Sequence, residues 1–204
     1  IGDVVSNRED RSIDSYDDLP FHEMVSSIPN EVNEIDVFLS TFGGSAHQVG
    51  RFVNALRERF ESVDFIIPSF CMSAGTLFAL SGNNLIMTER ACLGPIDPQV
   101  PTKDGFFVPA QALVLLVNEL QKQGDEARNQ GQPVPWTAVR IIDTIDKKDL
   151  GAAITATNYS TMMATQYIKD YKFQSWTVRE STGEPVTEQF KEARAEEIAK
   201  ALAS

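Results

Sequence analysis

The 204-residue sequence predicts an α/β fold, in which helices cover the faces of a parallel sheet. Three observations predict it. Short β-rich runs alternate with helical apolar patterns between residues 35 and 87, 42% of the residues are hydrophobic, and the composition is that of a globular protein rather than a disordered or collagen-like one. Alternating strands and helices over so short a stretch are typical of right-handed crossovers in one sheet.

The elements can be followed in order along the chain. Residues 35–40 form a β-rich run that ends at Gly43 and Gly44. Beyond them, apolar residues recur with helical spacing from Val49 to Phe60, so one face of this helix is expected to pack against the sheet. The alternation then continues with a second strand, a second helix and a third strand, at residues 63–68, 74–80 and 85–87.

The second half of the chain reads as mostly helical. Pro109 can open a helix whose apolar face contains leucine and valine side chains up to Leu120. A polar loop is expected over residues 124–135, and helical patterns follow from Trp136 onward, with a break near Gly183. We therefore expect one domain in three ranges: an acidic lead, an α/β catalytic core and a helical C-terminal part, at residues 1–34, 35–124 and 125–204.

The net charge argues against nucleic acid as a partner, and the lack of a long apolar run argues against a membrane segment. The net charge is −11, and nucleic-acid binding is not expected because it depends on clustered lysine and arginine. Seven of these net negative charges fall in residues 1–34, which we interpret as a solvated, partly flexible arm. No run approaches the roughly 20 apolar residues of a membrane helix, so no membrane segment is expected in this sequence.

The cysteines and histidines indicate neither a metal site nor a cofactor site. Cys71 and Cys92 lie in apolar surroundings, which suits buried free thiols in a reducing compartment, although the two could also pair. We expect a cytoplasmic location, with membrane association through segments outside this sequence as an alternative. Cys71 has no nearby histidine or basic cluster, so core packing is expected rather than nucleophilic chemistry. The two cysteines and two histidines lack metal-ligand spacing, and glycine-rich nucleotide motifs are absent.

The loops after the first two strands carry the candidate chemistry, because open α/β sheets bind ligands at the carboxyl ends of their strands. Gly43 and Gly44 can adopt positive φ and present backbone N–H groups to an oxyanion. Residues 69–76 lead from the second strand into a helix, with Ser73 at its mouth beside the N–H of Ala74. This pattern suits a nucleophilic serine. In the alternative interpretation, Ser73 only caps the helix.

Three ordered motifs give the stretch 35–99 a resemblance to a known family. They read Phe-Gly-Gly-Ser at residues 42–45, Met-Ser-Ala-Gly-Thr-Leu at 72–77, and Leu-Gly-Pro-Ile-Asp-Pro-Gln at 93–99. In these motifs and their separations the chain resembles the serine dehydrogenase proteinase family, a branch of the Clp-protease/crotonase fold related to signal peptide peptidase A. The resemblance is weaker over residues 109–119 and only compositional in the C-terminal helices.

The resemblance implies a ClpP/crotonase-like ββα spiral with a mostly helical C-terminal third, self-assembly into a homo-oligomer, and an ATP-independent serine peptidase acting on peptides or proteins without a cofactor. It makes Ser73 the nucleophile, forming an acyl-enzyme. Gly44, or alternatively Gly43, and Ala74 would supply the oxyanion N–H groups. Gly43 and Asp97 would line the cleft, although Asp97 could equally orient the base or stabilise a turn.

The general base is the open question. Clp protease subunits have a histidine some two dozen residues after the serine, whereas this chain has none there, and His22 and His47 are expected on the surface. Relatives of signal peptide peptidase A instead use a Ser-Lys dyad, in which a neutral lysine accepts the hydroxyl proton. Lys122 is the positional candidate and Lys103 the alternative; a merely solvated Lys122 and a base beyond Ser204 remain open.

Two further functions compete with the peptidase. A chain of this fold that lacks a competent base could be a noncatalytic oligomeric scaffold or a peptide-binding module. A crotonase-like acyl-thioester enzyme would use a similar oxyanion hole without a serine nucleophile. Loss of the Ser73 hydroxyl would separate the peptidase from both alternatives.

Overall fold

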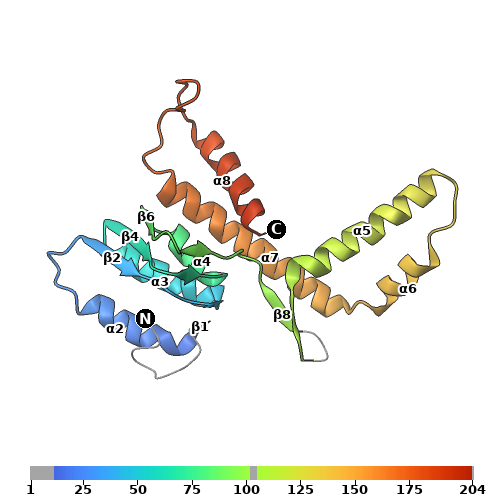
Figure 1. Ribbon diagram of the computed structural model, residues 1–204, viewed down its shortest axis with the longest axis horizontal. Coiled ribbons are helices and arrows are strands. Elements are labelled where there is room, and N and C mark those ends of the chain that lie inside the picture. The colour runs from blue at the N-terminus through green and yellow to red at the C-terminus, as the bar shows by residue number, and fades with distance from the viewer. Residues whose placement is uncertain (1–11, 102–104, 204) are drawn as a thin grey trace. The chain divides into compact units, whose positions relative to one another are not determined.

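The computed structural model describes residues 12–101 and 105–203, which form two compact units. Unit 1 combines the described residues up to Ile96 with Ser160–Leu202, and unit 2 extends from Asp97 to Tyr159. The fold is α/β, as predicted, and the C-terminal third is mostly helical (Figure 1). The three sequence ranges proposed for the domain stay a prediction.

A parallel three-stranded sheet forms the centre of unit 1, with the strand order β2-β4-β6. Its strands are β2 (Glu34–Phe38), β4 (Ser62–Ile67) and β6 (Leu85–Met87). Parallel neighbours require crossover helices, and the predicted alternation of strands and helices supplies them. Side chains alternate between the two faces of β4, and the three directed into the core are fully buried: Val63, Phe65 and Ile67.

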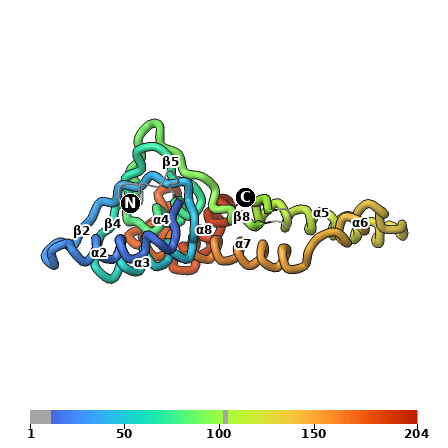
Figure 2. Tube along the Cα trace, turned by 90° about the horizontal axis from the view of Figure 1, so that it is seen from below, coloured from blue at the N-terminus to red at the C-terminus, as the bar shows by residue number. Residues whose placement is uncertain are grey.

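Two helices, α3 (Ala46–Arg59) and α4 (Ala74–Leu80), pack together and cover one face of this sheet (Figure 2). Their contact is dominated by aromatic rings. Phe78 of α4 lies edge-on to Phe65 of the sheet, with ring centroids 4.8 Å apart, and its centroid is 5.7 Å from that of Phe52 on α3. Every residue of α4 is buried, so the segment after the predicted nucleophile is anchored in the core.

The described part of the acidic lead is folded, which corrects the expectation of a solvated, partly flexible arm for residues 12–34. It forms β1 (Ser12–Ile13), a 3₁₀ turn η1 (Ser15–Asp17) and α2 (Asp18–Ser26). Phe21 of α2 is buried and stacks on Phe52 with centroids 4.0 Å apart. The carboxylate of Asp18 also accepts hydrogen bonds from the Arg51 guanidinium at 2.7 and 2.5 Å. Burial of this one aromatic face therefore outweighs the acidic composition.

Short strands and the end of the chain complete unit 1. Three two-residue strands follow the turns: β3 (Gly43–Gly44), β5 (Phe70–Cys71) and β7 (Cys92–Leu93). The C-terminal part contributes the end of α7 (Lys147–Tyr167), a π-helical turn η2 (Ile168–Lys172) and α8 (Glu188–Leu202). Ala195 and Ala199 of α8 are fully buried, and the N–H of Ile96 donates to the carbonyl of Leu202 at 2.9 Å.

Unit 2 consists of an antiparallel pair of strands, β8 (Gln99–Pro101) and β9 (Phe107–Pro109), followed by α5 (Ala110–Asn129), α6 (Trp136–Thr144) and the first part of α7. The pair was not predicted. The polar loop expected over residues 124–135 is wrong in its first half, because α5 continues to Asn129 with Ala127 buried and Asp125 paired with Arg128 at 2.6 Å. None of the described helices has both the length and the apolar character needed to cross a bilayer.

Candidate active site

The turn between β5 and α4 holds Ser73 in a strained backbone conformation. Ser73 has φ 49° and ψ −118°, and within residues 12–101 and 105–203 it is the one non-glycine residue with positive φ. Such a conformation costs of order 1–3 kcal/mol and persists only where the surroundings fix it. Here the N–H of Met72 donates to the carbonyl of Thr41 at 3.0 Å, and the N–H of Gly75 donates to the carbonyl of Met72 at 2.8 Å. A serine held in a sharp strand-to-helix turn is typical of nucleophile elbows.

The side chain of Ser73 does not cap α4. A capping serine adopts extended dihedrals and accepts an N–H two or three residues along the chain. Ser45 does this at the start of α3, where its hydroxyl accepts from the N–H of Gln48 at 3.2 Å. Ser73 has different dihedrals and makes no such bond. The interpretation of Ser73 as only a helix cap is therefore wrong.

Gly43 lies directly against this turn. A Cβ atom on Gly43 would lie 2.8 Å from the carbonyl oxygen of Met72, 2.8 Å from the Cβ of Ser73 and 3.4 Å from the nitrogen of Ala74. The residue also has φ 107°, which favours glycine. Its N–H donates to the Oγ1 of buried Thr41 at 3.1 Å. The glycine pair and the serine turn predicted from sequence are thus neighbours in the structure.

Gly44 is fixed by the first strand of the chain. It pairs with Ile13 in parallel register, and a Cβ on Gly44 would lie only 2.2 Å from the carbonyl oxygen of Ile13. The bond to that carbonyl comes from the N–H of Ser45, at 2.8 Å, and not from Gly44. Thr41 already accepts the N–H of Gly43, so of the two glycines Gly44 is the better candidate for an oxyanion donor.

The third sequence motif clamps the other side of the turn. Gly94 approaches Met72 so closely that a Cβ on Gly94 would lie 2.5 Å from the Met72 sulfur. The buried hydroxyl of Thr76 lies 2.8 Å from the carbonyl oxygen of Gly94 and 3.0 Å from that of Cys71. Glycine is needed at positions 43 and 94 because the neighbouring backbone and side chains leave no room for a Cβ. All three motifs therefore meet around one serine.

Cys71 is a core residue. Its side chain is fully buried, and burial raises the pKa of the thiol from 9.0 to about 12. A thiolate is therefore disfavoured, as the sequence predicts for this residue. Cys92, on the neighbouring strand β7, is exposed, which corrects the expectation that it is buried, and both cysteines are free thiols.

The base candidates are carried by other elements of the chain. Lys122 is exposed on α5 of unit 2, and its pairing with Ser73 stays a prediction. Asp97, also in unit 2, accepts the N–H of Gln111 at 3.1 Å, and burial raises the pKa of its carboxyl. His22 lies 3.7 Å from Asp18 and His47 is exposed in the first turn of α3. Lys103 falls outside the described residues.

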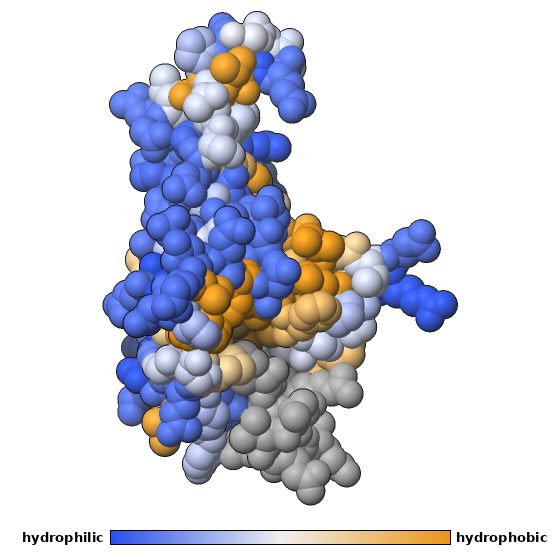
Figure 3. All heavy atoms as spheres, turned by 90° about the vertical axis from the view of Figure 1, so that its left-hand side faces the viewer, coloured by the Kyte–Doolittle hydropathy of each residue, from blue (hydrophilic) through white to orange (hydrophobic). Residues whose placement is uncertain are grey.

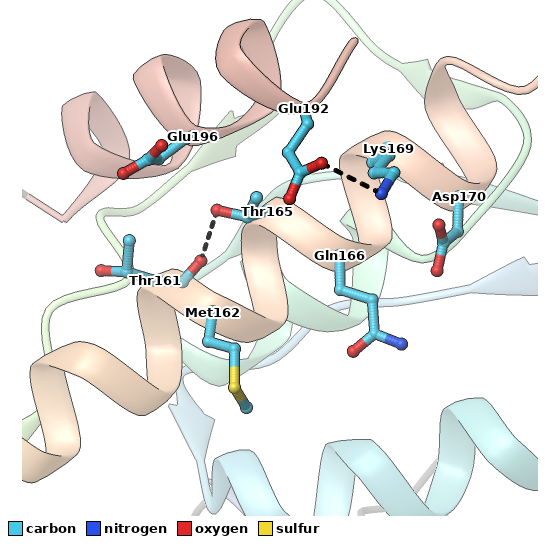
Figure 4. Close-up of a pocket in the computed structure, with 8 residues that line it drawn as sticks. All are labelled: Thr161, Met162, Thr165, Gln166, Lys169, Asp170, Glu192 and Glu196. Atoms are coloured by element: carbon cyan, nitrogen blue, oxygen red, sulfur yellow. Dashed lines mark hydrogen bonds and ion pairs between the residues drawn. The ribbon is translucent and has the colours of Figure 1, made fainter. Parts of the chain in front are cut away.

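A separate hollow of about 490 Å³ lies between α7, η2 and α8 (Figure 4). Most of its lining residues are polar, with Thr161, Thr165 and Gln166 on one side and Glu192 and Glu196 on the other, and Met162 adds an apolar side chain. Both glutamates are paired within the protein: Glu192 lies 3.5 Å from Lys169 of η2, and Glu196 lies 2.6 Å from Lys200 of α8. The hydroxyl of Thr165 donates to the carbonyl of Thr161 at 2.8 Å. In the described part of the chain no cluster of histidine, cysteine and acidic residues could hold a metal ion.

Sequence reasoning missed two parts of the site. Thr41 holds Gly43 and the turn after β5, but a threonine at a strand end is common and carries no distinct signal. Strand β1 fixes Gly44, and a two-residue strand is too short to show a period. The alternation of acidic residues with Ile13, Phe21 and Val25 was the available hint that this lead packs against the core.

The geometry defines an α/β protein with a strained serine at a strand-to-helix turn and a glycine pair beside it, as in serine hydrolases that use a backbone oxyanion hole. Residues 23–131 match the model of the ClpP-like SDH-type serine proteinase family. Because this match covers more than half of the chain, the protein belongs to that family. The family resemblance and the ClpP-like α/β fold expected from the sequence are thereby confirmed.

Two curated relatives come from Methanocaldococcus jannaschii. The uncharacterized protein MJ0137 is 38% identical over 96 residues, which is 47% of this chain and 31% of the relative. The uncharacterized protein MJ1495 is 35% identical over 92 residues, which is 45% of this chain and 30% of the relative. The matched region thus spans less than a third of the length of either relative.

Solved structures of two variants of the 1510-N membrane-bound stomatin-specific protease are also similar. One of them, in complex with a substrate peptide, has a TM-score of 0.41 and 20% identity and covers 57% of this chain and 56% of its own. The other has a TM-score of 0.41 and 19% identity and covers 60% of this chain and 61% of its own.

Proposed function

We propose that this chain carries the active site of an ATP-independent serine peptidase with Ser73 as the nucleophile. The observation that carries the proposal is that Ser73 has a strained backbone, does not cap α4 with its side chain, and lies in close contact with Gly43. The fold does not require this strain, since a serine cap at α4 would stabilise the helix without it. Membership of a serine proteinase family supports the same conclusion.

The proposed chemistry follows from the groups around Ser73. A peptide lies extended beside Gly43 and Gly44, and the Ser73 oxygen bonds to the carbonyl carbon while a base takes the hydroxyl proton. The N–H groups of Gly44 and Ala74 stabilise the resulting oxyanion. The base then gives the proton to the leaving amine as the peptide bond breaks, and water hydrolyses the acyl-enzyme on Ser73. The substrates are peptides or unfolded protein segments, because a folded protein does not present an extended chain to such an edge.

A fluorophosphonate probe tests this proposal directly. Attack by Ser73 on phosphorus would displace fluoride and leave the phosphonyl group on the serine oxygen, and peptide mapping by mass spectrometry would locate it. We expect one label, on Ser73, and none on the Ser73→Ala variant. Ser45→Ala is the matched control, because it removes a half-buried hydroxyl that only caps α3, and it should keep the label. A folded chain that takes no label would contradict the proposal.

We further propose Lys122 as the base of a Ser-Lys dyad. If it accepts the Ser73 proton, Lys122→Ala should slow fluorophosphonate labelling by about 10²- to 10⁴-fold, the usual contribution of a general base. Lys148→Ala, which removes another exposed lysine of unit 2, should leave the rate unchanged. Stopped-flow or timed-quench labelling measures both rates. Equal rates for Lys122→Ala and the unaltered chain would remove this assignment.

The competing proposal is a noncatalytic oligomeric scaffold of the same fold. It is favoured by the large apolar side chains that the helices of unit 2 expose: Leu115, Leu116, Trp136, Val139, Ile141, Ile142 and Ile154. Exposed apolar surface of this kind is typical of association sites, and self-assembly is compatible with the peptidase as well. Labelling of Ser73 is the result that separates the two.

A further inference from the structure

An apolar groove lies along the edge of the sheet in unit 1. It is a hollow of about 180 Å³ between α2 and β2, with Leu56 of α3 at its base. Met24 and Ile28 line it on the helix side, and Ile35 and Val37 line it on the strand side. It belongs to neither the Ser73 turn nor the glycine pair.

Strand β2 offers free hydrogen-bonding groups to this groove. The groups of odd-numbered residues face β4: the carbonyl of Asn33 accepts from Ser62 at 3.3 Å, and the N–H of Leu39 donates to Ile66 at 3.0 Å. Because successive residues of a strand face opposite edges, the N–H and C=O groups of residues 34, 36 and 38 point away from β4. Among the described strands, none pairs with that edge.

An open strand beside a helix and an apolar hollow is the geometry of β-strand addition. A peptide pairing with β2 would place alternate side chains over the hollow, next to Ile35 and Val37, and the others on the opposite face. The exposed apolar side chains nearby are Met24, Val32 and Phe38. Figure 3 views the side of the molecule on which α2 and β2 lie in Figure 1 and shows apolar side chains gathered there among polar ones.

The negative charge around this edge favours a partner segment with basic residues. Glu34 and Asp36 project from β2, and Glu31 lies in the loop just before it, all of them exposed. The guanidinium of Arg59 donates to the carbonyls of Val32 and Pro29, in the loop before β2. A second copy of this strand would place carboxylates opposite carboxylates, which is unfavourable, whereas lysine or arginine at those positions is favourable.

We propose that β2 is a docking edge for an extended partner segment in which apolar residues alternate with lysine or arginine. The apolar residues fill the hollow between α2 and β2, the basic residues face Glu34 and Asp36, and the main chain pairs with residues 34–38. This surface contains neither the Ser73 turn nor the glycine pair, so we assign it to a partner protein that carries such a segment.

A fluorescent nine-residue peptide that alternates lysine with isoleucine or valine is the probe. Its binding is measured by fluorescence anisotropy on the Ser73→Ala chain, which cannot cleave it. We expect saturable binding, which weakens by about tenfold when Glu34→Lys and Asp36→Lys are combined, because two favourable cross-strand pairs become repulsive. Asp36→Pro removes an outward N–H at an edge position and should abolish binding. Glu126→Lys, an exposed charge reversal on α5, is the matched control and should bind normally.

The other outcomes would overturn the proposal. Equal binding by the Glu34→Lys/Asp36→Lys variant, or by a peptide of the same composition with its lysines and apolar residues in separate blocks, would mean that strand pairing and cross-strand charge do not matter. If fluorophosphonate treatment of the chain with Ser73 intact abolishes binding, the peptide binds at the active site and not at β2. Self-association that Asp36→Pro abolishes would make a second copy the occupant. A chain that binds the peptide but takes no fluorophosphonate would refute the peptidase and leave this edge intact.

Discussion

Gly43→Ala should slow acylation of Ser73 and destabilise the chain. The added methyl would lie 2.8 Å from both the Met72 carbonyl oxygen and the Ser73 Cβ, and φ of 107° disfavours any L side chain. Since the obstacles are the backbone and the Cβ of the turn, Ser73 itself must move. A displacement of about 1 Å at a reacting group can cost about 10²-fold in rate. We expect labelling to slow by at least that factor and the free energy of unfolding to fall by about 2–4 kcal/mol.

Gly131→Ala is the matched control for this change. Gly131 also has positive φ, 66°, but a Cβ there would meet nothing within 4 Å. Its replacement should lower stability by only about 1 kcal/mol, the cost of a left-handed conformation, and leave the labelling rate unchanged. Urea unfolding and timed labelling measure both variants. If Gly43→Ala labels as fast as Gly131→Ala, the close contact between Gly43 and the serine turn is not needed for acylation.

Lys172→Met should stabilise the protein by roughly 2 kcal/mol at pH 7. The Nζ of Lys172 is buried without a hydrogen-bond partner, and burial lowers its pKa from 10.5 to about 8. The carboxylate of Asp64 opposes this shift and the Arg57 guanidinium adds to it. A buried ammonium without a partner destabilises the folded state, and methionine keeps the length of the side chain without the charge.

The pH dependence gives a second measurement. Because the folded-state pKa of Lys172 lies below its unfolded value, the unfolded chain binds more protons between pH 8 and 10.5, so this residue should make stability rise with pH across that window. Below pH 8 its destabilising effect is complete. Cys71 acts oppositely above about pH 9, since its pKa is raised in the folded state, but it does so in both proteins. The difference between the two unfolding curves therefore isolates Lys172.

Lys169→Met provides the comparison on the same turn. Lys169 pairs with Glu192 at 3.5 Å near the surface, and such pairs contribute at most about 1 kcal/mol. Its replacement should change the free energy of unfolding at pH 7 by at most about 1 kcal/mol. A Lys172→Met chain that is no more stable at pH 7 than the unaltered protein would show that the amine is solvated or paired.

The regular part of the fold could be predicted from the sequence because its elements are long enough to show a period. The strands at residues 34–38 and 62–67 and the amphipathic helix α3 fall close to their expected positions. The two-residue strands β1, β3, β5 and β7 have no period to detect. The continuation of α5 through Gly124 was missed because a glycine followed by polar residues resembles a loop, although Asp125 to Arg128 are compatible with a helix.

The site could be predicted in part for a similar reason. Glycine pairs and a serine at a strand-to-helix turn are visible in one sequence, and the family resemblance connects them. The positive φ of Ser73 could not be predicted, because it arises from bonds to Thr41 and from the contact with Gly43, which are distant in the chain. The base could not be assigned because a lysine accepts the hydroxyl proton only when burial lowers its pKa enough to leave the amine neutral, and sequence spacing does not encode burial.

The backbone conformation of Ser73 also predicts which substitution would accumulate at this position if selection for function were relaxed. A glycine there would adopt the same dihedrals without the steric penalty of a side chain. Selection for folding stability alone would favour glycine, whereas selection for the hydroxyl would retain serine. Whether descendants of this chain retain serine or drift to glycine at this one position thus distinguishes lineages that use the hydroxyl from lineages that retain only the scaffold.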